Sequence, residues 1–349
     1  MAIPHAFGRS SRWSVGLEEE LFVVDAETLA PRPVPPELLD GVRFKAELFA
    51  SVVELNTGIC RDVDEAVSEL ADLRAEAGRR AREAGVVLAA AGTWPTAVSE
   101  DEPVTQDPGY LAFVDYAGSA ARRQYCSGLH VHVGVASPAE CMERLDAVLP
   151  WLPLVLAVSA NSPYAAGRET GLASTRAEIL TLLPRSGAPP PFGAYADWER
   201  FAERLVELGL ADQITRIWWD VRPHPRYGTL EVRMPDQPTR LATTAALAAL
   251  VRALVAGSPP AAPADRGVYA QNRWAALRFG AAAELVHPAE ERLVAVPELL
   301  AELAARLGAT EAAGRLGELD QAGEQLEVGR RDGLPALCGH LVALTYDGL

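Results

Sequence analysis

The 349-residue chain lacks the long apolar runs, cysteine motifs and leader pattern that would mark several protein classes. No stretch is apolar over about 18 residues, so no transmembrane helix is expected. The first residues contain no apolar core of signal-peptide length. The four cysteines show no C-x-x-C spacing, and the chain is far longer than small disulfide-framed secreted domains. We therefore expect reduced thiols, a cytoplasmic location and no membrane partner.

Phosphate-binding glycine motifs and basic runs are also missing. Neither G-x-x-x-x-G-K-S/T nor G-x-G-x-x-G occurs, so a bound nucleotide would not be held by a P-loop or a Rossmann turn. The chain carries 32 Lys+Arg against 47 Asp+Glu, a formal net charge of −15. Without a segregated basic patch, this charge disfavours nucleic-acid binding. Most of the acids should solvate helix faces, so the informative ones are those at strand positions.

Helical and strand patterns alternate along most of the chain. Apolar periodicity predicts helices over 62–85, 137–158, 197–209, 239–256, 297–307 and 311–328. Short runs rich in valine, leucine and isoleucine predict strands over 13–24, 50–57, 86–91, 128–135 and 227–235. Proline-rich stretches at 184–195 and 257–265 indicate loops. Neither resembles an interdomain linker, so we expect an N-terminal arm over 1–12 and a single domain over 13–349.

Four of the predicted strands repeat one design. Side chains on a strand alternate between two faces. Each of these strands therefore places polar residues on one face and aliphatic residues on the other. The polar residues that share a face within their own strand are Glu18 with Glu20, Glu54 with Asn56, His130 with His132, and Glu231 with Arg233. A solvated strand face usually carries mixed Thr, Lys, Ser and Gln, so recurrent Glu and His require another explanation.

A divalent cation would explain these acids. If the strands are neighbours, their carboxylates converge, and like charges about 4 Å apart repel by roughly 4 kcal/mol at an effective dielectric of 20. Carboxylates with one imidazole suit Mg²⁺, which usually shares its coordination sphere with substrate phosphates. Two alternatives stay open from the residues alone. His130 and His132 could be metal ligands or structural side chains, although the lack of further His or Cys ligands disfavours zinc. Arg233 could form an ordinary ion pair with Glu231 or contact phosphate.

At these residues the chain resembles the type 2 glutamate–cysteine ligase family, the bacterial carboxylate–amine ligases related in fold to glutamine synthetase. The resemblance covers roughly residues 13–280. It rests on the segments Val15-Gly-Leu-Glu-Glu-Glu-Leu-Phe22, Val53-Glu-Leu-Asn-Thr-Gly-Ile-Cys60, Cys126-Ser-Gly-Leu-His-Val-His-Val-Gly134 and Trp218-Trp-Asp-Val-Arg-Pro-His-Pro-Arg-Tyr-Gly-Thr-Leu-Glu-Val-Arg233.

The resemblance implies an α+β fold, in which helices pack on the convex face of a curved, mainly antiparallel sheet. It implies that ATP and Mg²⁺ convert a carboxylate to an acyl phosphate, which an amine then attacks. Small-molecule substrates, with glutamate and cysteine as candidates, and a homo-oligomer are expected. The metal ligands carried over are Glu18, Glu20, Glu54, His130 and Glu231. The nucleotide or phosphate contacts are His130, Arg176, Arg222 and Arg233, and the catalytic residues are Glu54, Glu231 and Arg233.

One departure from the family pattern concerns the substrate. Trp94, in Gly92-Thr93-Trp94-Pro95, stands where many relatives carry a histidine, so the sequence does not identify the two compounds that are joined. Two other functions remain as alternatives. The chain could be a nucleotide-binding regulatory protein without turnover, or a metal-dependent amidase that uses His130 and His132 with the acids. A requirement for ATP separates ligation from amide hydrolysis.

Overall fold

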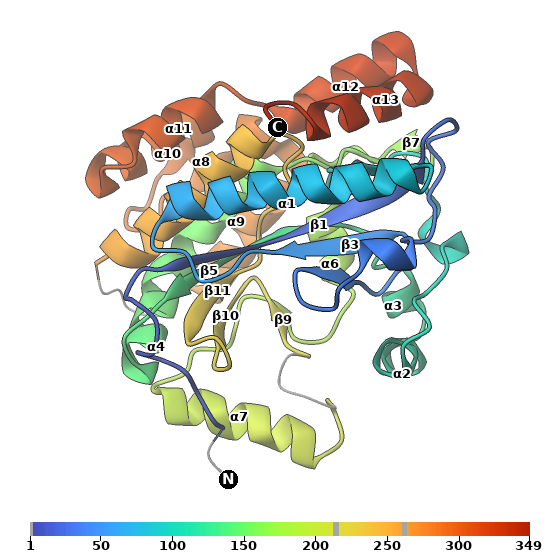
Figure 1. Ribbon diagram of the computed structural model, residues 1–349. Coiled ribbons are helices and arrows are strands. Elements are labelled where there is room, and N and C mark those ends of the chain that lie inside the picture. Colours follow the sequence, from blue (N-terminus) through green and yellow to red (C-terminus); the bar gives the residue numbers. More distant parts are fainter. Residues whose placement is uncertain (1–2, 212–215, 260–263) are drawn as a thin grey trace.

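The computed structural model describes residues 3–211, 216–259 and 264–349, and it shows an α+β fold built on one antiparallel sheet (Figure 1). The sheet order is β10-β11-β5-β1-β3-β2, and β4 pairs with β1. Its strands are β1 (Val15–Asp25), β2 (Phe44–Ala46), β3 (Val52–Asn56), β4 (Val86–Ala89), β5 (Leu129–Gly134), β10 (Val221–His224) and β11 (Thr229–Val232). The predicted fold class is confirmed.

Helices account for most of the remaining chain. They are α1 (Val63–Glu83), α2 (Pro108–Ala117), α3 (Ser119–Arg122), α4 (Pro138–Val148), α5 (Leu152–Ser159), α6 (Thr175–Leu180), α7 (Tyr195–Glu207), α8 (Leu241–Gly257), α9 (Arg266–Phe279), α10 (Val296–Leu307), α11 (Thr310–Gly317), α12 (Gln321–Asp332) and α13 (Leu334–Thr345). Small two-stranded sheets pair β6 (Tyr164–Ala165) with β7 (Arg168–Glu169), β8 (Ser186–Gly187) with β9 (Trp218–Trp219), and β12 (Glu284–Val286) with β13 (Leu293–Ala295).

Local sequence explains where the predicted helices begin and break. Asp62 and Ser137 cap α1 and α4 by accepting hydrogen bonds from Glu65 N and Glu140 N. The helix expected over 137–158 is interrupted at Leu149–Trp151, a 3-10 turn that contains a proline. The helix expected over 311–328 divides into α11 and α12, because Asp320 starts a new helix by accepting from Gly323 N. Part of the predicted 257–265 loop, residues 260–263, lies outside the described residues.

The aliphatic face of the sheet is covered by helices. Leu17, Leu21, Leu55 and Val131 belong to the largest buried apolar cluster, which includes residues of α1, α5 and α8. Figure 1 shows α1 lying across this face, with α8 behind it. The alternation read from the sequence therefore separates a packed face from a polar one.

Glu19 is the exception on the packed face. Its carboxylate is fully buried and forms a two-point ion pair with Arg74 of α1, at 2.6 and 2.7 Å. The same guanidinium donates hydrogen bonds to the carbonyl oxygens of Thr239 and Thr345. One buried arginine thus connects β1, α1, the start of α8 and the end of α13.

The polar face ends where β1 passes Glu20. Beyond it, Phe22 packs in a second buried apolar cluster with Trp94, Tyr125 and Phe49. The Phe22 and Tyr125 ring centroids are 5.1 Å apart, and Trp94 donates a hydrogen bond to Leu29 O. These aromatic residues close one end of the polar face.

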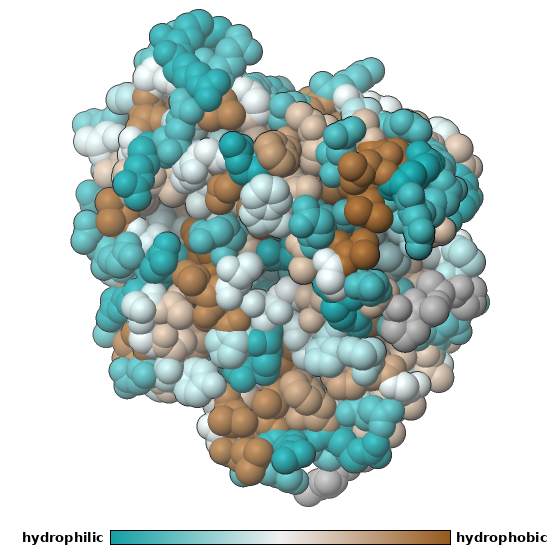
Figure 2. Space-filling model, turned by 180° about the vertical axis from the view of Figure 1, so that it is seen from behind, coloured by the Kyte–Doolittle hydropathy of each residue, from teal (hydrophilic) through white to brown (hydrophobic). Residues whose placement is uncertain are grey.

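The surface shown in Figure 2 mixes hydrophilic and hydrophobic residues, and brown residues gather at its lower edge, where α7 lies. Val206, Leu208 and Leu210 are exposed at the end of that helix. Within the ranges described above, no helix combines the length and apolar character needed to cross a membrane. Near the N-terminus, Phe7 is buried in the main core. The division of the chain into an arm over 1–12 and a domain over 13–349 stays a prediction.

Candidate active site

Strand pairing brings the singled-out polar side chains onto one face of the sheet. Glu18 lies opposite His130 on one side and Asn56 on the other. Glu20 lies opposite Glu54, and Glu231 lies opposite His132. Because antiparallel neighbours directly opposite one another have side chains about 5 Å apart, residues about 100 positions apart in sequence, such as Glu18 and His130, become contacts.

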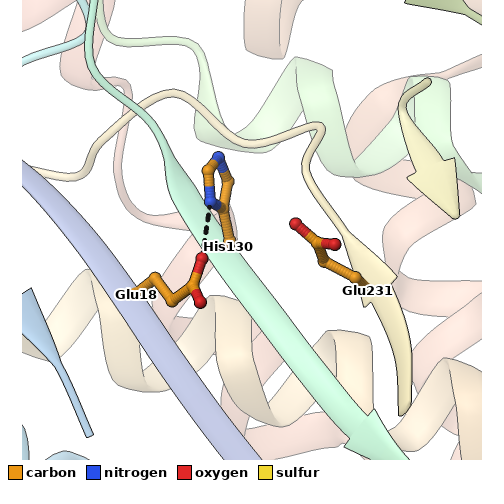
Figure 3. A group of neighbouring side chains, drawn as sticks. All are labelled: Glu18, His130 and Glu231. Carbon is orange, nitrogen blue, oxygen red and sulfur yellow. Dashed lines mark hydrogen bonds and ion pairs between the residues drawn. The ribbon is translucent and has the colours of Figure 1, made fainter. Parts of the chain in front are cut away.

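On this face of the sheet, two sets of three side chains have ligand atoms that all lie within 4.8 Å of one another. They are Glu18, His130 and Glu231, and Glu20, Glu54 and His130. Figure 3 shows the first set, with Glu18 on β1, His130 on β5 and Glu231 on β11 directed toward a shared space. His130 belongs to both sets and so joins them.

The two histidines flank Glu18. His130 Nδ1 lies 3.1 Å from one carboxylate oxygen and His132 Nε2 lies 3.3 Å from the other. Burial opposes ionisation of Glu18, but the two rings outweigh it and hold the pKa of Glu18 well below its usual range. Burial and the nearby Arg233 guanidinium lower the pKa of His130 to about 4. His130 is therefore neutral at physiological pH, as a metal-binding imidazole must be.

Glu231 is held between two arginines. Arg222 reaches it through Nε at 2.5 Å and Nη2 at 3.1 Å, and Arg233 pairs with the same carboxylate. Burial alone would raise the pKa of Glu231, but the two guanidinium groups hold it well below its usual range. Arg233 Nη1 also lies 3.4 Å from His130 Nδ1. Arg222 thus braces Glu231, while Arg233 borders both sets of ligand atoms.

The opposite side of the face carries excess negative charge. Burial raises the pKa of Glu20 to about 7, and the Glu54 carboxylate adds to the shift. Burial and Glu18 raise the pKa of Glu54. Glu47, which follows β2, is in hydrogen-bond contact with Glu54, and burial together with Glu54 and Glu20 raises its pKa well above the usual range. Three carboxyl groups that resist ionisation together need a cation before all can be charged.

Lys45 supplies the nearest positive charge on this side. Its ammonium group donates to Glu54 Oε1 at 3.2 Å and to Asn56 Oδ1 at 2.7 Å. Burial lowers the pKa of Lys45, but Glu54 and other acidic neighbours raise it further, so the group stays charged. Neither Lys45 nor Glu47 was among the predicted site residues, because β2 is only three residues long and shows no period-two pattern. A usable signal was present: Lys45 is the only lysine in the chain.

Arg176 reaches the site from α6, outside the sheet. Its guanidinium donates to the carbonyl oxygens of Met234 and Arg233, at 3.2 and 3.1 Å. It lies directly against Gly128, where an added Cβ would be 2.0 Å from Arg176 Nη2. Asp236 supports the arrangement by accepting from Ser162 Oγ, whose oxygen in turn accepts from Arg176 N. Arg176 is therefore rigidly placed behind Arg233.

The donor set fits a hard divalent cation. Carboxylate oxygens dominate both sets, and oxygen is the ligand atom that Mg²⁺ prefers. His130 Nε2 is buried and has no hydrogen-bond partner among the described residues, so it is available as a ligand. Neither of the two sets on the polar face includes a cysteine, and each includes a single histidine, His130. This composition is unlike the histidine- and cysteine-rich sites of zinc.

Three connected cavities surround these groups. The central cavity, of about 670 Å³, is lined by Glu18, Glu20, Glu47, Glu54, His130 and Arg233 among others. A second cavity, of about 600 Å³, is called the adenosine-sized side cavity below because the family resemblance implies ATP as a ligand. It is lined by Lys45, Ile59, His132 and Tyr227 among others and meets the central one at Glu18, Arg226 and Tyr227. A third cavity, of about 130 Å³, is called the apolar side cavity below after Phe49, Phe113, Leu180 and Trp218. It is also lined by charged residues, among them Glu47, Arg176 and Arg216, and it meets the central one at Glu20 and His130.

Comparison with known proteins shows to which family the chain belongs. The model of glutamate-cysteine ligase family 2 (GCS2) matches residues 14–331. The chain belongs to this family. A protein of Rubrobacter xylanophilus, provisionally named glutamate–cysteine ligase 2-3, is 40% identical over 308 residues, which cover 86% of this chain and 85% of that protein. A Sorangium cellulosum protein, provisionally named glutamate–cysteine ligase 2, is 38% identical over 307 residues, which cover 84% and 82%.

The fold is shared with a solved ligase. The glutamate–cysteine ligase of Francisella tularensis, crystallised in complex with AMP, superimposes with a TM-score of 0.70 over 97% of this chain and 90% of that chain, at 13% identity.

In the present chain, Trp94 is buried beside Phe22 and lines none of the three cavities. Trp219 is likewise buried and stacks on Phe201. Trp218, by contrast, lines both the central and the apolar side cavity.

Proposed function

We propose that this member of the glutamate–cysteine ligase family 2 is an ATP-dependent carboxylate–amine ligase. In the proposed reaction, the substrate carboxylate attacks the γ-phosphorus of ATP, giving an acyl phosphate and ADP. The amine then attacks the acyl carbon, the amide bond forms, and inorganic phosphate leaves. The observation that carries the proposal is the cluster of Glu18, Glu20, Glu54, His130 and Glu231 between two dissimilar cavities.

The sizes of the two side cavities support an assignment of their occupants. Small-molecule sites usually measure about 300–1,000 Å³, and the adenosine-sized side cavity, at about 600 Å³, falls in that range. A nucleoside bound there would direct its phosphates past Glu18 into the central cavity, where the acids lie. The AMP bound by the related Francisella ligase is consistent with a nucleotide site in this fold.

The roles of the acids and arginines follow from this placement. Glu18, Glu20, Glu54, Glu231 and His130 would hold Mg²⁺, which supplies neutralisation of phosphoryl oxygens when it is bound. Arg233 borders the central cavity and can donate to the phosphoryl group or the acyl oxygen. Arg222 holds the Glu231 carboxylate, and Arg176 braces the backbone that carries Arg233. Arg222 and Arg176 thus contribute chiefly by positioning.

The apolar side cavity suits a substrate side chain. At about 130 Å³ it has room for a small substrate side chain. Its lining combines charged residues with apolar ones such as Phe113 and Leu180; the charged ones are Glu20, Glu47, His130, Arg176, Arg216 and Arg233. The family name points to glutamate as the carboxylate and cysteine as the amine, and we propose this pair as the first to test.

The decisive experiment measures ADP release with glutamate and other carboxylates against a panel of amines that includes cysteine. Hydroxylamine is added as a small amine that traps an acyl phosphate as a hydroxamate. Glu54→Gln and Glu231→Gln each remove one carboxylate from the predicted metal site. We expect each to reduce carboxylate-dependent ADP release by about 100-fold or more, with unchanged circular dichroism.

Glu311→Gln is the matched control, because Glu311 is exposed on α11 and remote from the site residues. It should retain wild-type turnover. Full turnover in both Glu54→Gln and Glu231→Gln would refute the site assignment. ATP binding without ADP release for any pair would favour a regulatory protein, and amide hydrolysis without ATP would favour an amidase.

A further inference from the structure

The chain contains 32 Lys+Arg residues, of which only Lys45 is lysine and the other 31 are arginine. At every other cationic position arginine suffices. Arginine and lysine differ physically: the guanidinium is a planar fork with donors in fixed directions, whereas the ammonium is a compact point charge with three rotatable donors. Lys45 is therefore the one position in the chain that carries the compact charge, and its surroundings decide what that charge can do.

Lys45 occupies the boundary between the adenosine-sized side cavity and the acids. Lys45 lies on β2, an edge strand of the sheet. Its side chain is on the same face as that of Glu54, the residue directly opposite it on the neighbouring strand β3. It lines the adenosine-sized side cavity, while Glu54 lines the central cavity. Its side chain is 33% exposed. The ammonium is therefore accessible from the cavity and is fixed from behind by Glu54 and Asn56.

The other cations that line the same cavity are placed differently. Arg43 is directed to Glu69, with Nη2 at 2.8 Å from its carboxylate. Arg226 is exposed and lies over the Tyr227 ring, 5.8 Å from its centroid. Neither hydrogen-bonds the acid cluster, whereas Lys45 contacts both Glu54 and the cavity. Arg226 lines the junction between this cavity and the central one, whereas Lys45 is the lining cation that is hydrogen-bonded to the acid cluster.

We propose that Lys45 binds a non-transferred phosphate of the nucleotide, taking the part that a P-loop lysine has in other ATP-binding folds. The inference rests on the proposed function, since it requires a nucleotide in the adenosine-sized side cavity. Lysine acts on phosphate as a point charge, and its three donors allow it to keep Asn56 and Glu54 while reaching a phosphate oxygen. A longer, planar guanidinium at position 45 would have to leave one of these partners.

A purely structural role is the competing explanation, because Lys45 also neutralises part of the charge on Glu54. The two roles predict different accessibility of the Lys45 ammonium group to a chemical reagent. A phosphate contact makes the ammonium inaccessible when nucleotide is bound. A structural ion pair gives the same accessibility with and without nucleotide.

Amine acetylation measures the accessibility of Lys45 directly, because Lys45 is the one lysine in the chain. The α-amino group of the chain serves as the internal reference. The full-length protein is treated with an acetylating reagent alone, with Mg²⁺, with Mg²⁺ and ATP, with Mg²⁺ and tripolyphosphate, and with adenosine. The Lys45 peptide is quantified by mass spectrometry. We expect ATP and tripolyphosphate to slow acetylation about 10-fold or more, and neither Mg²⁺ alone nor adenosine to slow it. Equal acetylation in all samples would overturn the proposal.

Variants give a second readout. Because a hydrogen bond to a charged group contributes enough to change affinity about 10- to 100-fold, Lys45→Met should raise the dissociation constant for Mg-ATP and the KM for ATP by that factor. Lys45→Arg should recover only part of this loss. Arg61→Met is the matched control, because it removes one exposed positive charge at the start of α1 and should bind ATP normally.

The outcomes separate this inference from the proposed ligase activity. Nucleotide-dependent protection of Lys45 without ADP release for any substrate pair would support the phosphate contact and contradict the ligase. ADP release with an unprotected Lys45, or with a Lys45→Met enzyme of wild-type KM, would support the ligase and contradict the phosphate contact. A Lys45→Arg enzyme identical to wild type would show that only charge matters, which would overturn the argument from the single lysine.

Discussion

Glu18 and Glu20 lie two residues apart on the same face of β1, yet their surroundings shift their pKa values in opposite directions. Two imidazoles hold the Glu18 carboxylate in its charged form. Burial and the neighbouring Glu54 favour the protonated form of Glu20, whose pKa rises to about 7 although Arg176 and Arg233 oppose the change. Glu18 is therefore already ionised before a cation binds, whereas Glu20 becomes fully ionised near neutral pH only when a cation is bound.

This contrast predicts a pH-dependent effect of Glu20→Gln in metal-free protein. The pKa of Glu20 is about 4.5 in the unfolded chain and about 7 in the folded one. Folding therefore favours its protonated form, and this contribution is lost as pH rises from about 4.5 through about 7. At about pH 8 the variant should be more stable than the wild type by up to about 3 kcal/mol, with a much smaller difference at about pH 5.

Urea unfolding in the presence of a chelator measures this difference. Glutamine at position 20 can still accept the hydrogen bond from Gly128 N, so the comparison isolates the charge. Added Mg²⁺ should reverse the order at about pH 8, because it stabilises the wild-type carboxylate. A variant that gains no stability at about pH 8 would show that the carboxylate is not charge-stressed.

The residues of the site differ in how far sequence could predict them. Period-two counting placed Glu18, Glu54, His130 and Glu231 on a polar face, and the strand pairs join them there. Glu47 could not be found in this way, because it follows a strand of three residues. The roles of the predicted ligands remain predictions that the variants above test.

At the scale of elements, β1 connects the site to the helical layer. Its polar face carries Glu18 and Glu20, and the residue between them, Glu19, enters the core to pair with Arg74 of α1. Alternation predicted the first two and gave no account of the third. The partner of a buried acid comes from tertiary packing, since Arg74 lies 55 positions further along and its other contacts involve Thr239 and Thr345.

Breaking this pair should destabilise the protein strongly. Arg74→Met leaves the Glu19 carboxylate buried without its main partner, which costs about 3–5 kcal/mol when a buried ion pair loses one member. The double variant Glu19→Met, Arg74→Met removes both charges and should lose less stability than Arg74→Met alone. Chemical denaturation of the two single variants and the double variant measures the coupling. Additive losses would show that the pair is not energetically linked.

At the scale of the whole molecule, the fold was more predictable than its connections. The sheet, its antiparallel character and the helical layer followed from alternation and family resemblance, and the structure confirms that fold class. Helices α9 and α13 were not predicted: α13 has apolar residues around much of its surface and starts at a glycine, so neither period nor cap marks it. The position of α13 therefore depends on long-range packing. Helix α9, by contrast, has local signals that were overlooked, since Asp265 caps its start and Gly280 follows its end.

The separation of the two side cavities predicts separable kinetic effects. They have no lining residue in common. Leu180→Trp fills the apolar side cavity and should raise the KM of one small substrate about 10-fold while leaving the KM for ATP unchanged. Ile59→Asp places a charge at the rim of the adenosine-sized side cavity, where Ile59 is 74% exposed. It should raise the KM for ATP and leave the KM of the small substrate unchanged. Steady-state kinetics with the best substrate pair tests both, and a change in both constants for either variant would contradict the assignment.

Strand β2 adds a consequence for thermal behaviour. It is three residues long, and within the described sheet it pairs with β3 alone. An edge strand held on one side exchanges its amide protons through local opening, at a free energy below that of global unfolding. The lysine that it carries and the acid that follows it would then lose their geometry while β1, β3 and β5 remain paired. Warming should therefore inactivate the protein at a lower temperature than the one at which it unfolds cooperatively.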